Sequence, residues 1–314
     1  MKINPQMFRG YDLRGIVGTD LNAEIVEHIG KAFGTYLKRQ GISGAVVGQD
    51  SRATSPEYSS AIIRGMSWAG VDTIDIGMTM VGTFYWSQYH LNRKGGVFIT
   101  ASHNPAEYNG MKFANDFSET LVSEGMNELR RMVQEDDIEK GEQEGKTEKK
   151  DILGAYIEDL SKRLNISKKF RVVVDASCAT PGVVAPKILR SFGMDAVESN
   201  CNLDPTFPLG TPDPTETAVA ERLKAKVLEE KADVGFSYDA DGDRIGIVDE
   251  KAELSGTMFW WRSLQSMCLK NTRARRLCTI RFARKWWKIQ SKNSAASRSC
   301  GGRVIHFSKR KTRK

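Results

Sequence analysis

Hydrophobic positions in residues 1–254 follow two spacings, one typical of helices and one typical of strands. Within 20–40, Ile25, Ile29, Phe33 and Leu37 recur every four residues, which places them on one face of an amphipathic helix. Residues 96–100 form a short apolar run, as expected for a buried strand. Similar patterns predict helices beginning at Ser55 and over 122–133, 152–164, 183–192 and 216–231. Further strands are predicted at 45–48, 72–77, 171–175 and 233–237.

The alternation of strands with helices predicts the fold class. Helices that cross between strands cover both faces of a parallel sheet, so we expect an α/β protein. A charged, glycine-bearing stretch at 134–150 interrupts the alternation and is typical of a linker or an exposed helix and loop. We therefore expect two successive three-layer αβα domains with mixed, mostly parallel sheets, at 1–148 and 149–254.

The overall composition is that of a globular protein. Of the 314 residues, 40% are hydrophobic and 27% are charged, which argues against a largely disordered chain. No apolar run approaches 18 residues and none follows Met1 as a signal peptide would, so we expect no membrane span and no secretion. The five cysteines lack metal-site spacing, and their odd number suits a protein of the reducing cytoplasm.

The net charge of +8 is the sum of two unlike parts. Residues 255–314 hold 17 of the 47 basic side chains and none of the 39 acidic ones, so residues 1–254 carry a net charge of −9. The same 60 residues contain four of the six tryptophans, three of the five cysteines and none of the nine prolines. We therefore treat 255–314 as an irregular basic tail that differs in kind from the rest.

A first candidate site follows the predicted strand at 96–100. Ligands of open α/β sheets bind beyond the carboxyl ends of strands, so the segment 100–112 is well placed for a site. Ser102 would be exposed there beside His103, with Lys112 ten residues further on. Asn104-Pro105 and Asn109-Gly110 are also ordinary turn sequences, so a loop that serves only the backbone geometry remains the alternative.

A second candidate site follows the predicted strand at 233–237. Asp239, Asp241 and Asp243 occupy alternate positions and can converge on one Mg²⁺ ion, which leaves coordination positions open for a phosphate or water. Arg244 could bind a phosphate through two hydrogen bonds. The alternative is a solvated acidic turn, which would suffer repulsion among three carboxylates. An EF-hand is excluded, because Arg244 stands where that loop needs glycine and the flanks are strand-like.

Together these segments resemble the α-D-phosphohexomutase superfamily, and in particular its phosphomannomutase/phosphoglucomutase branch. The resemblance extends over about 1–254. It is carried by FRGYDLRG at 8–15, GQDSR at 48–52, TASHNP at 100–105, PDPT at 212–215 and DADGDR at 239–244. Gln49 departs from the pattern, since the family commonly has a basic residue there.

The resemblance implies a mechanism and a set of site residues. Ser102 would be a phosphoserine and a ligand of one Mg²⁺ ion, together with the three aspartates. The chain would be an intramolecular phosphotransferase. It would move a phosphoryl group between the 1 and 6 positions of a hexose phosphate through a bisphosphate. The family residues that match positions near the transferring group, as charge stabilisers or acid–base participants, are Arg14 and Lys112, with His103 supporting the loop or acting directly. Substrate and phosphate would be bound by Tyr11, Asn104 and Arg244.

The resemblance also implies two further domains. A Gly-Glu-x-Ser-Gly-His sugar-binding loop is expected in the first of these, the third domain of the family, but the motif does not occur in this sequence. Because that loop would position the sugar, the sequence does not predict competent mutase activity for this chain alone. A catalytically dead remnant that binds metal or phosphate is the alternative, and mannose, glucose and glucosamine phosphates all remain open as substrates.

The tail has a genetic interpretation that codon degeneracy can test. Methionine and tryptophan have single codons, so 258–262 (MFWWR) fixes most of its own gene sequence. Shifted by one base, and with CGG for the arginine, it reads Val-Leu-Val-Ala, which suits the start of the third domain. The same offset returns family-like residues at 286–288 and 303–306. We therefore expect a frame-shifted, poorly folded third domain.

The competing interpretation of the tail is a nucleic-acid partner. Its 17 cations with interspersed aromatic residues could bind phosphate backbones. However, zinc-ligand spacing and a helix-turn-helix signature are both missing from it, so we do not expect nucleic acid to be the partner.

Overall fold

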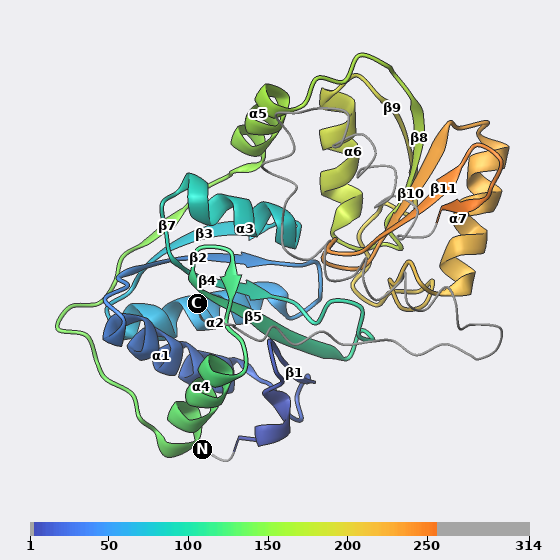
Figure 1. Cartoon of the computed structure of the whole chain (residues 1–314). Coiled ribbons are helices and arrows are strands. Elements are labelled where there is room, and N and C mark those ends of the chain that lie inside the picture. Colours follow the sequence, from blue (N-terminus) through green and yellow to red (C-terminus); the bar gives the residue numbers. More distant parts are fainter. Residues whose placement is uncertain (1–2, 256–314) are drawn as a thin grey trace, which may run out of the picture. The chain divides into compact units, whose positions relative to one another are not determined.

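The computed structural model describes residues 3–255, which form two β-sheets with helices on their faces (Figure 1). The predicted basic tail lies outside the described residues, except for Ser255 at the end of the last strand. The frame-shifted origin of the tail and its charge are therefore not addressed by the structure. The α/β class with mixed sheets is confirmed, and the domain boundaries at 148 and 254 stay predictions.

The first sheet has seven strands. Its order is β1-β5-β4-β2-β3-β7, with β6 paired to β5. The strands are β1 (Leu13–Ile16), β2 (Gly44–Gln49), β3 (Asp72–Met78), β4 (Gly95–Ile99), β5 (Tyr108–Asp116), β6 (Glu119–Thr120) and β7 (Thr147–Lys149). Neighbours from β4 to β7 are parallel, whereas β5 runs antiparallel to both β1 and β4.

Helices cover both faces of this sheet, as the alternating pattern predicts (Figure 1). They are α1 (Ala23–Arg39), α2 (Ser55–Trp68), α3 (Val81–His90) and α4 (Glu124–Glu135), after a short 3₁₀ turn η1 (Pro5–Met7). The larger core joins α1, α2 and α4 to one face, and Ile29, Phe33 and Leu37 of the predicted helical face are all fully buried in it. The smaller core packs α3 on the opposite face through Phe84 and Phe98.

The second sheet has the order β12-β11-β10-β8-β9. Its strands are β8 (Arg171–Asp175), β9 (Asp195–Ser199), β10 (Val234–Tyr238), β11 (Ile245–Asp249) and β12 (Leu254–Ser255). The helices around it are α5 (Leu153–Arg163), α6 (Pro181–Ser191) and α7 (Thr217–Glu229). One core packs α6 against Val172 and Val174, and the other packs α7 against Val173 and Val248, so successive residues of β8 point to opposite faces.

The charged stretch at 134–150 differs from the expected linker or exposed helix and loop. Its last residues form β7, which pairs in parallel with β3 at the edge of the first sheet. Just before β7 the chain passes close to the backbone of Val71. A Cβ on Gly145 would lie only 2.1 Å from the carbonyl oxygen of Val71, so this approach requires glycine. Charged, exposed side chains are typical of an edge strand, so hydrophobic periodicity gave no signal for it.

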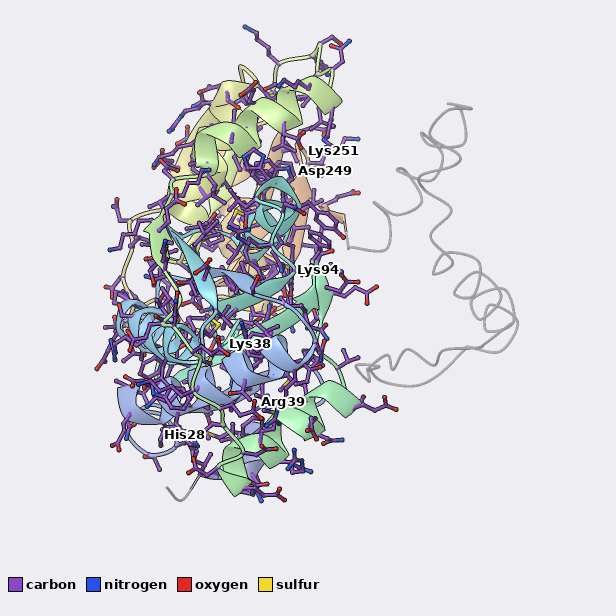
Figure 2. The ribbon with its side chains drawn as sticks, turned by 90° about the vertical axis from the view of Figure 1, so that its left-hand side faces the viewer. His28, Lys38, Arg39, Lys94, Asp249 and Lys251 are labelled. Atoms are coloured by element: carbon purple, nitrogen blue, oxygen red, sulfur yellow. The ribbon has the colours of Figure 1, made fainter. Side chains whose placement is uncertain are left out.

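Within residues 3–255, none of the helices is both long enough and apolar enough to cross a bilayer. The surface carries charged side chains over both sheets and their helices, among them Lys38 and Arg39 at the end of α1 (Figure 2).

Candidate functional site

Two loops, one from each sheet, meet at the centre of the candidate site. The Ser102 loop (residues 100–107) connects β4 to β5, and the Asp loop (residues 239–244) connects β10 to β11. Ser102 Oγ donates a hydrogen bond of 2.8 Å to Asp239 Oδ2, and Thr100 Oγ1 donates one of 3.1 Å to Asp241 Oδ2. The backbone N–H of Val81 donates to the carbonyl of Asp241 at 2.9 Å. The structure therefore brings together the two segments that the sequence analysis singled out.

The Ser102 loop holds its serine in an uncommon backbone conformation. Ser102 has φ +51°, in the left-handed region that residues with a Cβ seldom occupy. Its N–H donates to Thr100 Oγ1 at 2.8 Å, and the N–H of Asn104 closes a turn on the carbonyl of Ala101. Backbone strain of this kind persists where surrounding contacts fix it, and it is enriched at functional sites.

The Asp loop gathers three carboxylates. One oxygen from each of Asp239, Asp241 and Asp243 lies within 4.8 Å of the others. Burial, followed by the charges of its two neighbours, raises the pKa of Asp239 to about 9. Asp241 is fully buried, and its Oδ1 has no hydrogen-bond partner in the described part of the chain. Crowded carboxylates with an unused buried oxygen suit a hard divalent cation, which prefers oxygen ligands.

Lys112 faces these carboxylates from β5 rather than from a loop. Its Nζ donates to Asp241 Oδ2 at 2.7 Å and to Asp243 Oδ2 at 2.8 Å. Burial alone would lower the pKa of Lys112, but the two carboxylates outweigh it and raise the pKa. Burial would likewise raise the pKa of Asp241, yet the adjacent ammonium lowers it. The two carboxylates therefore favour the protonated form of Lys112 at this site.

Arg14 is fixed to the Ser102 loop from β1. Its Nη1 donates to the carbonyl of Ala101 at 2.9 Å and to Asn104 Oδ1 at 2.7 Å. Its Nε donates to Asp12 Oδ2 at 2.8 Å, and Nη2 lies 2.8 Å from the same oxygen. These contacts occupy four of the five N–H groups, which leaves one on Nη2 for a phosphate oxygen.

His103 and Arg244 are the remaining predicted residues that contact the two loops. His103 Nδ1 lies 3.1 Å from Ser102 Oγ, and its Nε2 lies 3.4 Å from Arg244 Nη2. A guanidinium only donates, so Nε2 accepts and the ring proton is on Nδ1, facing Ser102. Burial, then Arg244 and Arg14, lowers the pKa of His103 and favours this neutral form. Arg244 also donates to Asp213 Oδ2 at 2.7 Å, which fixes its direction.

Tyr11 stands apart from this arrangement. Its side chain is 46% exposed and makes no hydrogen bond with residues 3–255. Every other predicted site residue makes a polar contact with the Ser102 loop, the Asp loop or their neighbours. The role of Tyr11 in substrate binding stays a prediction.

Several polar and aromatic residues that position the site were missed by the sequence analysis. Asp12 and Asp213 lie inside the quoted motifs 8–15 and 212–215, so the motifs contained a signal for them. Asp50 and Arg52 also lie in a quoted motif, 48–52, without an assigned role. Phe207, which packs between the two loops, lies outside every quoted motif.

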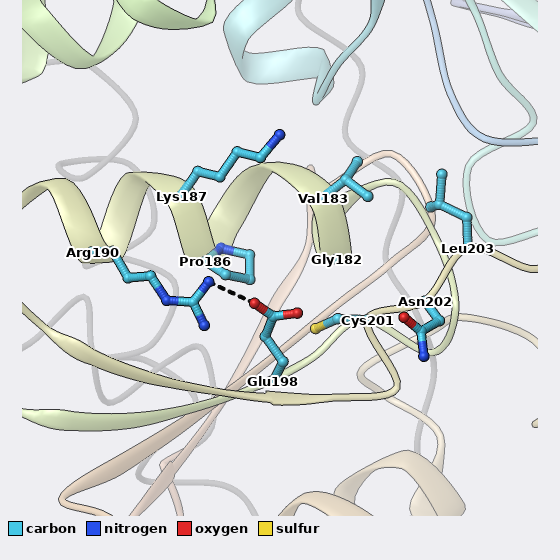
Figure 3. Close-up of a pocket in the computed structure, with 9 residues that line it drawn as sticks. All are labelled: Gly182, Val183, Pro186, Lys187, Arg190, Glu198, Cys201, Asn202 and Leu203. Carbon is cyan, nitrogen blue, oxygen red and sulfur yellow. Dashed lines mark hydrogen bonds and ion pairs between the residues drawn. The ribbon is translucent and has the colours of Figure 1, made fainter.

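A hollow of about 280 Å³ lies away from both loops, between α6 and the end of β9. Figure 3 shows Lys187 pointing away from it and Arg190 paired with Glu198 at 2.6 Å across it. The ion pair satisfies two of the three charged side chains that line the hollow, and none of the lining residues belongs to the Ser102 loop or the Asp loop. We assign no ligand to it.

Comparison with protein families gives two matches. The model described as phosphoglucomutase/phosphomannomutase, alpha/beta/alpha domain I, matches residues 5–140, and that for domain II matches 154–254. Together they cover most of the chain. The matched ranges contain both the Ser102 loop and the Asp loop.

Individual relatives agree with these matches. The phosphomannomutase/phosphoglucomutase of Pseudomonas aeruginosa is 36% identical over 242 residues, which are 77% of this chain and 52% of that protein. A Neisseria meningitidis phosphoglucomutase is 31% identical over 248 residues, 79% of this chain and 54% of its own. A Burkholderia thailandensis crystal structure, of a phosphoglucomutase/phosphomannomutase family protein, has a TM-score of 0.77 at 29% identity and covers 81% of this chain and 56% of that one.

The chain spans about half the length of the curated relatives it matches. Over that half, the family models, the relatives and the crystal structure point to one group of proteins. The chain belongs to the phosphoglucomutase/phosphomannomutase family of the phosphohexomutase superfamily.

Proposed function

We propose that this chain carries the phosphoserine half of a Mg²⁺-dependent phosphohexomutase site. The observation that carries the proposal is the hydrogen bond from Ser102 to Asp239, at the edge of a three-carboxylate cluster. The names of the relatives, phosphomannomutase and phosphoglucomutase, support hexose phosphates as the substrate class. The reaction moves a phosphoryl group between the 1 and 6 positions of the hexose through Ser102.

The metal would be held by Asp239, Asp241 and Asp243, with an oxygen of the phosphorylated Ser102 as a further ligand. The oxygen-only donor set and the unused Oδ1 of buried Asp241 support Mg²⁺ rather than a softer metal. When bound, Mg²⁺ stabilises the negative charge of the transferring phosphoryl oxygens.

In the transfer step, a hydroxyl oxygen of the sugar phosphate forms a bond to phosphorus while the bond from phosphorus to Ser102 Oγ breaks. The hydroxyl proton is released as the new ester forms, and Ser102 Oγ regains a proton. In the dephosphorylated chain Ser102 Oγ donates that proton to Asp239 Oδ2, with 2.8 Å between the two oxygens. The bisphosphate then returns its other phosphoryl group to Ser102 by the reverse step.

The surrounding cations have distinct tasks in this scheme. Lys112 keeps its proton because two carboxylates raise its pKa, which favours charge stabilisation over acid–base catalysis. Arg14 directs its remaining N–H toward a phosphate oxygen, while the Ser102 loop holds two of the other four and Asp12 holds two. Neutral His103 donates from Nδ1 to Ser102 Oγ and so orients the hydroxyl. Arg244 and Tyr11 are left to bind the substrate.

The test is the phosphorylation of Ser102 in the full chain. The protein is incubated with Mg²⁺ and glucose 1,6-bisphosphate or mannose 1,6-bisphosphate, and its intact mass and phosphopeptides are measured. We expect one phosphate on Ser102 in the wild type and none in Ser102→Ala. Wild-type protein that takes up no phosphate and matches Ser102→Ala would overturn the proposal. Mg²⁺ binding without phosphate uptake would instead identify a binding-only remnant.

A further inference from the structure

Arg52 is a buried cation whose hydrogen bonds converge on one loop. It follows β2 and is only 2% exposed. Nη1 donates to the carbonyls of Pro105 and Tyr108 at 2.7 and 2.8 Å. Nη2 donates to those of Ser102 and Asn104 at 2.7 and 2.6 Å. All four terminal N–H groups thus bind backbone oxygens of the Ser102 loop and the first residue of β5.

The guanidinium is itself held from the opposite side. Its Nε lies 3.2 Å from Asp50 Oδ2, and the other oxygen of that fully buried carboxylate accepts from Ser55 Oγ at 2.6 Å. Ser55 Oγ also accepts from Asn109 Nδ2 at 3.1 Å. The start of α2, the end of β2 and the beginning of β5 therefore fix where Arg52 can lie.

Phe207 connects this arrangement to the second sheet. Its ring centroid lies 5.1 Å from the guanidinium carbon of Arg52, within the range of a cation–π contact. Phe207 is 5% exposed and forms a small core with Ala179 and with Ala240 of the Asp loop, and Ala106 of the Ser102 loop packs against this core. Phe207 has φ +50°, so its backbone adopts a strained conformation to place the ring there. The core around Phe207 thus joins both site loops, and its aromatic ring contacts the arginine behind them.

We propose that Arg52 and Phe207 are positioning residues, which hold the Ser102 loop in register with the Asp loop. This inference rests on the proposed function of Ser102, because register matters only if a group on Ser102 must meet the carboxylates. Four hydrogen bonds to carbonyls between Ser102 and Tyr108 fix the loop from behind. The core around Phe207 fixes the same loop relative to Ala240 of the Asp loop.

The chemistry of the two side chains explains why simple replacements should fail. A planar guanidinium can bind four carbonyls in fixed directions, whereas an ammonium has three donors around one atom. Arg52→Lys keeps the buried charge opposite Asp50 but leaves at least one loop carbonyl unpaired. Phe207→Leu keeps an apolar group between the loops but removes the aromatic face that contacts Arg52.

The experiment compares local protection with phosphoryl transfer in the full chain. Hydrogen exchange is followed by mass spectrometry on peptides that cover 100–108, where the N–H groups of Ser102 and Asn104 are hydrogen-bonded. The variants are Arg52→Lys and Phe207→Leu. Phe33→Leu is the matched control, because Phe33 is a fully buried phenylalanine of α1 in a core that contains no residue of either loop.

We expect Arg52→Lys to raise exchange in 100–108 about tenfold, as the loss of one hydrogen bond to a charged group would. Phe207→Leu removes a desolvated cation–π contact of comparable strength, so a rise of about tenfold is expected there as well. Phe33→Leu should leave this peptide unchanged. At saturating glucose 1,6-bisphosphate, the rate of Ser102 phosphorylation should fall by about 10- to 100-fold in the site variants. The bisphosphate concentration at half-maximal rate should stay the same, since neither residue contacts the sugar in this scheme.

Each result decides the inference. Exchange that is unchanged in 100–108, or that rises equally in all peptides and in Phe33→Leu, overturns the positioning role. A loop that exchanges faster while Ser102 is phosphorylated at the wild-type rate also overturns it. If wild-type protein takes up no phosphate, the proposed function of Ser102 fails, and a local rise in exchange then still supports the contact itself.

Discussion

The ion pair between Lys112 and Asp241 gives the sharpest test of the electrostatics at the site. The Asp241 side chain is fully buried and that of Lys112 is 8% exposed, at a separation of 2.7 Å. Asp241→Asn leaves the ammonium with Asp243 alone, whose side chain is 42% exposed. Lys112→Met leaves the Asp241 carboxylate buried without a cation.

Breaking a buried pair by removing one partner typically costs about 3–5 kcal/mol of unfolding free energy. We expect the lower end, about 3 kcal/mol, for each single variant, because Asp243 and Thr100 remain as partners. The double variant leaves neither charge unpaired. Its cost should therefore be smaller than the sum of the two single costs, by about 2 kcal/mol of coupling.

The assay is urea unfolding in EDTA, so that no divalent cation contributes to stability. The pair of Lys94 and Asp116, 3.1 Å apart with both side chains 56% exposed, is the matched surface control; Lys94 lies on the outside of the molecule (Figure 2). The cycle of Lys94→Met and Asp116→Asn should give a coupling below about 1 kcal/mol. Single costs at Lys112 and Asp241 that simply add in the double variant would refute the reasoning.

Three further predictions follow from the same contacts. Asp12→Asn weakens the charge-assisted anchor of Arg14, so Ser102 phosphorylation from a bisphosphate should slow about tenfold in a mass-spectrometric time course; an unchanged rate would contradict the anchoring. Hydrogen bonds from Arg39 lower the pKa of Asp137, so the stability that this carboxylate contributes is present above about pH 4 and lost at lower pH. The difference in urea midpoint between wild type and Asp137→Asn should therefore shrink from pH 6 to pH 2, and a constant difference would contradict this role of the ion pair. Burial raises the pKa of Cys201 to about 12, so iodoacetamide at pH 8 should label its peptide only after denaturation, and rapid labelling of folded protein would contradict this.

The sequence analysis predicted those parts of the fold whose signal is local. The helix over 20–40 was readable because its buried face repeats every four residues, and the structure places it at Ala23–Arg39. The two loops were readable because each follows a short apolar strand and contains a compact motif. By contrast, β7 is held by backbone hydrogen bonds to β3 and has only exposed side chains, so its sequence resembles a linker.

The arrangement of the candidate site depends on contacts that no local pattern encodes. Asp239 meets Ser102 across 137 residues, and Lys112 meets Asp241 across 129. Through the resemblance the sequence could name these residues as a set. It could not show that Lys112 lies in one charge cluster with buried Asp239 and Asp241 and exposed Asp243. That cluster decides the protonation of its members, since the pKa of Asp239 rises while that of Asp241 falls within the same loop. Identical residue types therefore acquire different chemistry from their neighbours.

The two loops also explain why the residues behind the site matter as much as those in it. Ser102 and the three aspartates come from different sheets, so their spacing is set by whatever packs between the loops. Few contacts join the loops directly, and those from Ser102 and Thr100 end on carboxylates that a metal would also bind. In the proposed reaction these contacts change, so they cannot fix the spacing by themselves. Arg52 and Phe207 bind backbone oxygens and apolar atoms instead, so their contacts persist whether or not Ser102 carries a phosphate.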